Sequence, residues 1–163
     1  MPEKEFRACY GIDSHAFEET ECKKLVLAGT AFENEKGLKA HSDGDVALHA
    51  LFNAISSAAG GKSIGHYFPD SKPEFKNADS KIFIEKALQL MKEKGFRLNN
   101  LGLMIECLKP KIEPRADEMK DNLSRLLSLD KERISIIATT GEGLTSFGQG
   151  KGIHVSCTVS LTK

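Results

Sequence analysis

The stretch His41-Ser-Asp-Gly-Asp-Val-Ala-Leu-His49 marks the point where an irregular polar segment enters a helix. Ser42, Asp43 and Asp45 each carry a side-chain oxygen that can accept hydrogen bonds from free backbone amides, so each is a candidate N-cap. The apolar residues that follow, up to a pair of glycines, predict a helix over residues 45–59.

Two histidines and one carboxylate can meet at a single divalent metal ion. Asp13 and His15 follow a predicted strand over residues 6–12, where side-chain direction repeats every two residues, so both point the same way. Together with His49 they form the ligand set of a catalytic zinc with one open position. The alternative is that His49 is a core histidine that hydrogen-bonds beneath a strand. The spacing of four residues also places His41, Asp45 and His49 on one face.

The start of the predicted helix adds a second feature to this set. A helix N-terminus presents free amides and the positive end of a dipole, which favour an anion. A metal with an open position beside such an anion site indicates phosphate chemistry.

The rest of the chain predicts a mixture of helices and strands. Further strands are expected over residues 25–28, 101–108, 134–139 and 153–161, and further helices beginning at Asp79-Ser80 and near Pro114. Residues 65–73 are rich in glycine and proline and are expected to form a loop. These elements fit a single α+β domain over residues 1–163, with one mixed β-sheet and helices packed on one face.

Composition excludes several classes of protein. The 163 residues contain 23 Lys and Arg against 23 Asp and Glu, so no overall charge points to nucleic acid or an anionic membrane. No apolar run approaches the roughly 20 residues that span a bilayer. The start of the chain lacks the apolar core of a signal peptide. Cys9, Cys22, Cys107 and Cys157 are widely separated, which favours reduced cysteines in the cytoplasm.

Six motifs in the right order resemble those of the 2-C-methyl-D-erythritol 2,4-cyclodiphosphate synthase family, over about residues 7 to 161. They are Asp13-x-His15, the stretch His41 to His49, Phe68-Pro69-Asp70, Ala78-Asp79-Ser80, Pro110-Lys111 and Ala138-Thr139-Thr140-x-Glu142. The resemblance implies a homotrimer with sheets around a central axis and active sites shared between neighbouring subunits. It also implies that the protein works in a bacterial cytoplasm, or in a plastid stroma if a transit peptide has been removed.

The resemblance also implies a reaction. In this family the 2-phosphate of 4-diphosphocytidyl-2-C-methyl-D-erythritol 2-phosphate attacks the β-phosphate in line. CMP leaves and 2-C-methyl-D-erythritol 2,4-cyclodiphosphate forms, a step of the non-mevalonate isoprenoid pathway. By resemblance, Asp13, His15 and His49 bind Zn²⁺, which Mn²⁺ or Co²⁺ could replace, and Glu142 binds Mg²⁺. Thr140 joins these four as a catalytic residue.

The resemblance further implies a set of substrate contacts. These are His41, Ser42, Ser63, Ile64, Gly65, Phe68 and Asp70 for the phosphate, methylerythritol and ribose portions, and Cys107, Pro110, Lys111, Ile112, Glu113, Thr139 and Thr140 for cytosine and phosphate.

Several positions depart from the family pattern, and none is a metal ligand. Ser63 stands where the family has an Asp that contacts the ribose. Gly143 stands where the family has a Lys, and Asn53 stands where it has an acidic residue. Gln149 replaces an Arg and Ser156 a Glu in the region lining the central cavity of the trimer, so the isoprenoid diphosphate held there in some relatives is not expected.

Three alternatives remain. A zinc phosphohydrolase would use the same three ligands to activate water. A trimer that binds zinc and nucleotide without turnover is favoured by Ser63 and Gly143, and opposed by the intact ligand set. A purely structural trimer would have no need of a metal with an open position.

Overall fold

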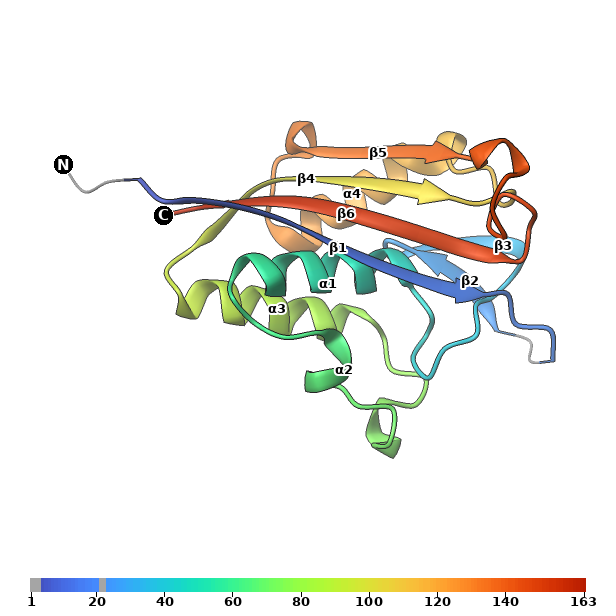
Figure 1. The fold of residues 1–163 in the computed structure, drawn as a ribbon, viewed down its shortest axis with the longest axis horizontal. Coiled ribbons are helices and arrows are strands. Elements are labelled where there is room, and N and C mark those ends of the chain that lie inside the picture. The colour runs from blue at the N-terminus through green and yellow to red at the C-terminus, as the bar shows by residue number, and fades with distance from the viewer. Residues whose placement is uncertain (1–3, 21–22) are drawn as a thin grey trace.

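A mixed four-stranded sheet forms the centre of the computed structural model, which describes residues 4–20 and 23–163 (Figure 1). Its strand order is β1-β6-β4-β5, with β1 at Phe6–Ala16, β6 at Gly152–Thr162, β4 at Arg97–Glu106 and β5 at Ile134–Thr139. The pairs β1–β6 and β6–β4 are antiparallel, and β4–β5 is parallel. The expectations for Cys22 and for Met1 to Glu3 lie outside the described residues.

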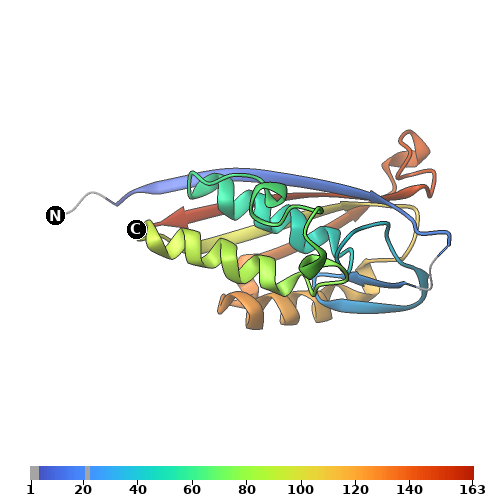
Figure 2. The same ribbon diagram turned by 90° about the horizontal axis from the view of Figure 1, so that it is seen from below.

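The longer helices lie on one face of this sheet (Figure 2). Helix α1 (Val46–Ala58) packs against β1 and β6, α3 (Lys81–Glu93) packs against α1, and α4 (Ala116–Leu127) packs against β5. The α+β fold with a mixed sheet and helices on one face, which the sequence predicts, is therefore confirmed. None of the described helices is long and apolar enough to cross a membrane.

Three local differences from the sequence prediction affect the site. Strand β1 extends to Ala16, so that Asp13 and His15 lie inside it rather than after it. A short helix, α2 (Ile64–Tyr67), and a 3-10 turn (Pro73–Phe75) interrupt the expected loop over 65–73. A hairpin of β2 (Lys24–Leu27) and β3 (Thr30–Lys36) forms a second sheet, of which only the first strand was predicted.

The close approach of β1 to α1 depends on Gly11. A Cβ atom at Gly11 would lie 2.5 Å from the Ala50 carbonyl oxygen of α1, a separation that real Cβ atoms do not show. Only glycine lets the strand backbone contact the helix backbone here. Asp13 and His15 follow Gly11 along β1, and His49 precedes Ala50 on α1, so this contact sets the distance between the two parts of the ligand set.

The face of the sheet opposite the helices is lined by exposed apolar side chains. Ile12, Met104 and Ile137 lie in one row across the strands with Ser156 between the first two, and Tyr10 extends from the next position on β1. Tyr10 is 70% exposed and Ile137 is 54% exposed. Within residues 4–20 and 23–163, no helix or strand covers this face (Figure 2). Exposed apolar areas of this kind are typical of interaction surfaces.

Candidate metal centre and active site

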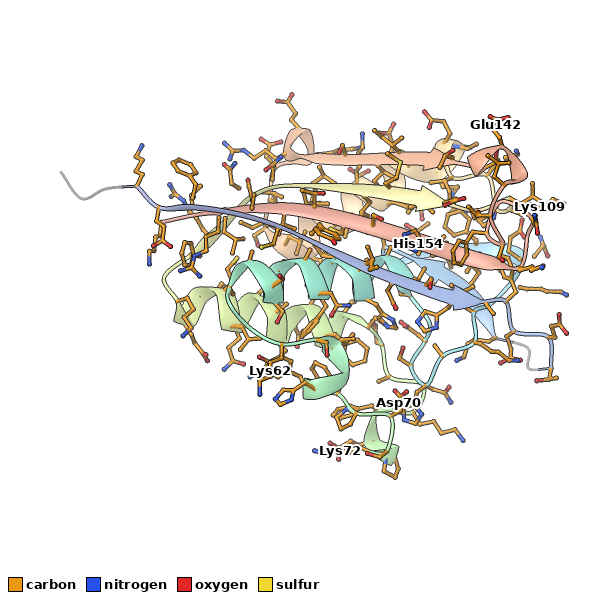
Figure 3. The ribbon with its side chains drawn as sticks, viewed as in Figure 1. Lys62, Asp70, Lys72, Lys109, Glu142 and His154 are labelled. Atoms are coloured by element: carbon orange, nitrogen blue, oxygen red, sulfur yellow. The ribbon has the colours of Figure 1, made fainter. Side chains whose placement is uncertain are left out.

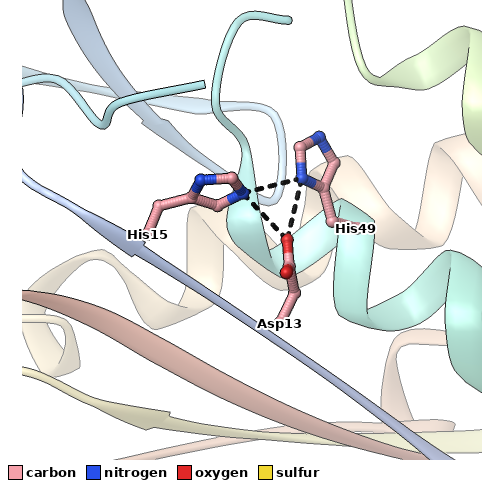
Figure 4. Close-up of side chains that lie close together, drawn as sticks. All are labelled: Asp13, His15 and His49. Carbon is pink, nitrogen blue, oxygen red and sulfur yellow. Dashed lines mark hydrogen bonds and ion pairs between the residues drawn. The ribbon is translucent and has the colours of Figure 1, made fainter. Parts of the chain in front are cut away.

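Asp13, His15 and His49 converge on one point between β1 and α1 (Figure 4). Asp13 Oδ2 lies 3.0 Å from His15 Nε2 and 3.0 Å from His49 Nδ1, and the two nitrogens lie 3.3 Å apart. Ligands bound to zinc at about 2.0–2.1 Å in a tetrahedral arrangement are separated by about 3.3 Å. The set therefore has the donor types and the spacing of a zinc site.

Hydrogen bonds on the far side of each imidazole orient the ring toward this point. His15 Nδ1 lies 2.6 Å from the Lys39 carbonyl oxygen, which can only accept, so Nδ1 carries the proton and Nε2 presents a lone pair. His49 is reversed, with Nε2 at 3.0 Å from Ser80 Oγ and 3.1 Å from Ser42 Oγ. Partners of this kind fix the tautomer of metal-binding histidines.

Asp43 extends this support of His49 by one further step. Its carboxylate accepts hydrogen bonds from the Ser80 hydroxyl and, at 3.0 Å, from the Ser80 backbone amide. Because the Ser80 hydroxyl proton is donated to Asp43, its oxygen is left to accept from His49 Nε2–H. Ser80 is fully buried. A continuous chain of contacts from Asp43 through Ser80 therefore leaves Nδ1 of His49 free to bind a metal.

The ionisation of the ligand set also suits a cation. Burial raises the pKa of the Asp13 carboxyl, but hydrogen bonds and charges from His15 and His49 outweigh it and hold the pKa well below its usual range. Burial lowers the pKa of His15, but the Asp13 carboxylate outweighs it and the pKa is raised. Asp13 is therefore ionised at neutral pH, and binding of a metal releases a proton from His15 whenever that ring is charged.

Asp45 does not share a face with His49, contrary to the sequence prediction. Its carboxylate points away from the ligand set, toward the hairpin, and accepts from the amides of Ala28 at 2.9 Å, Gly29 at 2.7 Å and Leu48 at 3.0 Å. Asp45 is the N-cap of α1 with a non-helical ψ of 84°, so the helical spacing rule does not apply to it. Its burial raises its pKa to about 6, against the effect of the three amide donors.

A cavity of about 330 Å³ opens beside the ligand set. Of the predicted substrate contacts, it is lined by His41, Ser42, Ile64, Gly65, Phe68 and Asp70. Ser63, the N-cap of α2, is exposed and does not line it. Lys39, Phe75 and Phe83 also line the cavity and were not predicted, although Lys39 is a cation close to His41 in the sequence. Asn53 links the two walls by donating to the Ile12 carbonyl and accepting from the Ile64 amide.

The residues expected to contact cytosine and phosphate line a different cavity, of about 380 Å³. These are Cys107, Pro110, Lys111, Ile112, Glu113, Thr139 and Thr140, at the ends of β4 and β5. Ala138 and Leu108 add apolar surface. Burial raises the pKa of the Cys107 thiol to about 11, so this cysteine is a packing group rather than a nucleophile.

Glu142 lies in the connection between β5 and β6 and lines neither cavity. It is exposed, with a left-handed φ of 54°. Figure 3 shows Glu142 beyond the end of β5 and Asp70 beyond the helices, well separated from each other. The metal ligands belong to β1, at one edge of the sheet, and to α1, whereas Glu142 follows β5 at the other edge.

A two-histidine, one-aspartate set that opens into a cavity is the arrangement found in enzymes that bind a divalent metal ion. The sequence matches the YgbB family over residues 6–162. It is 46% identical over 159 residues to the 2-C-methyl-D-erythritol 2,4-cyclodiphosphate synthase of Aquifex aeolicus, which covers 98% of this chain and 99% of that protein. The chain belongs to the 2-C-methyl-D-erythritol 2,4-cyclodiphosphate synthase family. It is a phosphorus-oxygen lyase of the non-mevalonate isoprenoid pathway.

Solved structures agree with this assignment. A CDP-bound form of a 2-C-methyl-D-erythritol 2,4-cyclodiphosphate synthase is similar with a TM-score of 0.85 and 36% identity, covering 95% of this chain and 99% of that one. The bifunctional IspDF from Campylobacter jejuni is similar with a TM-score of 0.92 and 38% identity. That match covers 99% of this chain and 43% of the bifunctional chain, so this chain corresponds to less than half of it.

Proposed function

We propose that the family reaction takes place here at a site completed by two copies of the chain, one supplying the metal centre and the other the nucleotide cavity and Glu142. The substrate is 4-diphosphocytidyl-2-C-methyl-D-erythritol 2-phosphate, and the products are CMP and the 2,4-cyclodiphosphate. The observation that carries the proposal is the Asp13, His15 and His49 set, with its tautomers fixed, open to a cavity.

Two metals serve the reaction in this proposal. Zinc, or manganese or cobalt in its place, is held by Asp13, His15 and His49, and magnesium is held by Glu142. When bound, they supply positive charge that offsets the repulsion between the attacking and the attacked phosphate groups.

The residues of the first cavity hold the methylerythritol end of the substrate. Asp70 accepts hydrogen bonds from its hydroxyl groups, while Ile64 and Phe68 cover its carbon skeleton. His41 and Ser42 contact the phosphate. The attacking 2-phosphate is already ionised at neutral pH, so no side chain has to act as a general base. Holding a folded substrate in the attacking geometry contributes about 7–11 kcal/mol.

The residues of the second cavity hold the nucleotide end. A pyrimidine ring needs an apolar slot with backbone hydrogen-bonding groups, and the loop from Cys107 to Glu113 offers both, with Lys111 adding a charge for phosphate. Thr139 and Thr140 lie where the diphosphate leaves this slot. A related synthase has been solved with CDP bound, which supports a nucleotide site in this chain.

Separation of the two half-sites within one chain supports a shared active site. Strands lie about 4.8 Å apart, so β1 and β5, three steps apart in the sheet order, are separated by about 14 Å. Two metals that act on one phosphoryl group lie only about 4 Å apart. This separation of the strands that lead to the two half-sites supports the proposal that Glu142 comes from a neighbouring copy.

A closed ring of three copies accounts for both the half-sites and the uncovered sheet face. When one edge of each subunit meets a different edge of the next, the contact is heterologous, and it forms a ring where the rotation between subunits closes. The sheets then face a common axis, which covers Tyr10, Met104 and Ile137. We propose this homotrimer, built from one domain over residues 1–163 and working in the cytoplasm, with neither nucleic acid nor membrane as a partner.

Product analysis tests the proposed reaction. The protein is loaded with zinc and incubated with Mg²⁺ and the substrate, and CMP and the cyclodiphosphate are followed by mass spectrometry. The proposal expects both products together, and neither from an Asp13→Asn variant. CMP with an uncyclised diphosphate would mean that water is the nucleophile, as in a phosphohydrolase. Binding of substrate without products would identify a non-catalytic relative.

A further inference from the structure

The segment that carries Glu142 has an unusual backbone. Gly141, Glu142 and Gly143 have φ values of +57°, +54° and +72°, so three successive residues are left-handed. Glycine adopts this conformation freely, whereas a residue with a Cβ atom pays about 1–2 kcal/mol for it. The intrinsic preference of the segment therefore does not hold Glu142 in place, and contacts with the rest of the molecule have to do so.

One such contact comes from Glu106, at the end of β4. Its carboxylate accepts a hydrogen bond from the Thr145 hydroxyl, and Thr145 Oγ in turn accepts from the Gly148 amide at 3.1 Å. The same carboxylate lies directly against Gly141, where a Cβ atom would collide with Oε1. Glu106 thus contacts the segment on both sides of Glu142, and Thr145 connects it to the returning part of the loop.

Further contacts close the loop around this carboxylate. Gln149 Nε2 donates to the Gly143 carbonyl at 3.1 Å, and the Leu108 amide donates to the Phe147 carbonyl at 3.1 Å. The Phe147 ring packs on His154, whose Cα pairs with that of Glu106 across the sheet. Figure 3 shows Glu142 and His154 at this end of the molecule. Gln149, where the family has Arg, therefore has a role in this chain as a support of the loop.

We infer that Glu106 is a positioning residue, which through Thr145 and Gly141 holds residues 141–148 in the conformation that presents the Glu142 carboxylate. Glu106 lines neither cavity, so it acts through the loop and not on the substrate. It belongs to a strand hydrogen-bonded on both sides, by β6 and β5, and is thus a rigid support. The inference rests on the proposed function insofar as Glu142 binds magnesium.

Two readouts on zinc-loaded protein test this inference. The first is hydrogen exchange of the 141–148 amides, which should speed up about tenfold in Glu106→Ala because the loop opens more often. The second is the affinity for CDP, which should fall about tenfold in Glu106→Ala with Mg²⁺ present and stay unchanged without Mg²⁺. Glu106→Gln, which keeps an oxygen to accept from Thr145, should restore most of both.

Thr145→Val should reproduce the effects of Glu106→Ala, and the double variant should be no worse than either single variant, because both remove one contact. Glu132→Ala, which removes an exposed acid at the opposite end of β5, is the matched control and should change neither readout.

The two readouts separate this inference from the proposed function. If Glu142→Ala leaves the Mg²⁺-dependent part of CDP binding intact, the magnesium role of Glu142 is wrong, and the exchange rates alone decide the role of Glu106. If Glu142→Ala abolishes that part while Glu106→Ala changes neither readout, the positioning role is wrong and the proposed function stands. Unchanged exchange of residues 141–148 in Glu106→Ala overturns the inference in either case.

Discussion

Replacing Ser80 by Ala should weaken zinc binding although Ser80 does not contact the metal position. The substitution removes the oxygen that accepts from His49 Nε2 at 3.0 Å and so loosens the ring orientation that presents Nδ1. Loss of such an outer partner costs about 10- to 100-fold in metal affinity. Because Ser42 Oγ remains at 3.1 Å from the same nitrogen, the lower end is expected, about tenfold or 1.4 kcal/mol.

Zinc affinity is measured by competition with a chromophoric chelator at constant pH, and stability by urea unfolding of the metal-free protein. The metal-free Ser80→Ala variant should also lose about 2 kcal/mol of stability, because the charged Asp43 carboxylate loses the hydrogen bond from the Ser80 hydroxyl. Ser56→Ala is the matched control, because Ser56 is fully buried and donates to the Lys62 carbonyl at 2.6 Å, away from the metal ligands. It should lose stability but not zinc affinity. Equal zinc affinities for wild type and Ser80→Ala, or an equal loss of zinc affinity in Ser56→Ala, would show that Ser80 does not orient His49.

Three further substitutions test other parts of the account. The pKa of Asp45 in the folded state is raised to about 6, above the unfolded value of about 3.9. The folded state therefore binds more protons than the unfolded state between these two pH values. The free energy of unfolding falls as the pH rises from about 4 to about 6. The free energy of unfolding of the metal-free wild type, measured with urea, should therefore fall by roughly 3 kcal/mol between pH 4 and pH 6, and that of Asp45→Asn should not. Parallel pH profiles of wild type and variant would contradict this expectation. Gly11→Ala should lower the free energy of unfolding by about 1–3 kcal/mol and weaken zinc binding, because the new methyl group pushes β1 away from α1. An unchanged zinc affinity would show that the close approach of β1 to α1 does not set the ligand geometry. Ile137→Glu should leave the fold intact by circular dichroism, because the side chain is exposed. It should break the proposed trimer into monomers in sedimentation, and a variant that sediments with the same mass as the wild type would place the interface elsewhere.

The metal ligands could be predicted from sequence because local rules govern each part. Asp13 and His15 share a direction on any strand, and the polar start of α1 with its apolar continuation fixes where His49 lies along the helix. The prediction for Asp45 was wrong because the helical spacing of four residues was applied to the N-cap, which lies outside the helical turns. Its neighbours Ala28 and Gly29 come from the hairpin, and no local pattern shows that contact.

The hairpin and the cavity walls were harder to predict for related reasons. Strand β3 was missed because its turn contains Ala28 at a φ of 50°, where glycine or asparagine would be the usual signal. Lys39 and Phe75 come from irregular segments whose positions depend on tertiary contacts. Phe83 follows helical spacing on α3, which indicates a core residue and does not reveal that Phe83 also borders a cavity.

Subunit complementation tests most directly the central claim that each active site uses two copies. Asp13→Asn and Glu142→Ala chains, each expected to be inactive alone, are co-expressed with different affinity tags and the mixed trimers are assayed for cyclodiphosphate. In a head-to-tail ring of three, every mixed trimer has about one site in three that pairs an intact metal centre with an intact Glu142, whichever variant is present twice. We therefore expect the purified mixed trimers to have roughly a third of the wild-type activity. Mixed trimers as inactive as their parents would contradict it, because both half-sites would then have to come from the same chain.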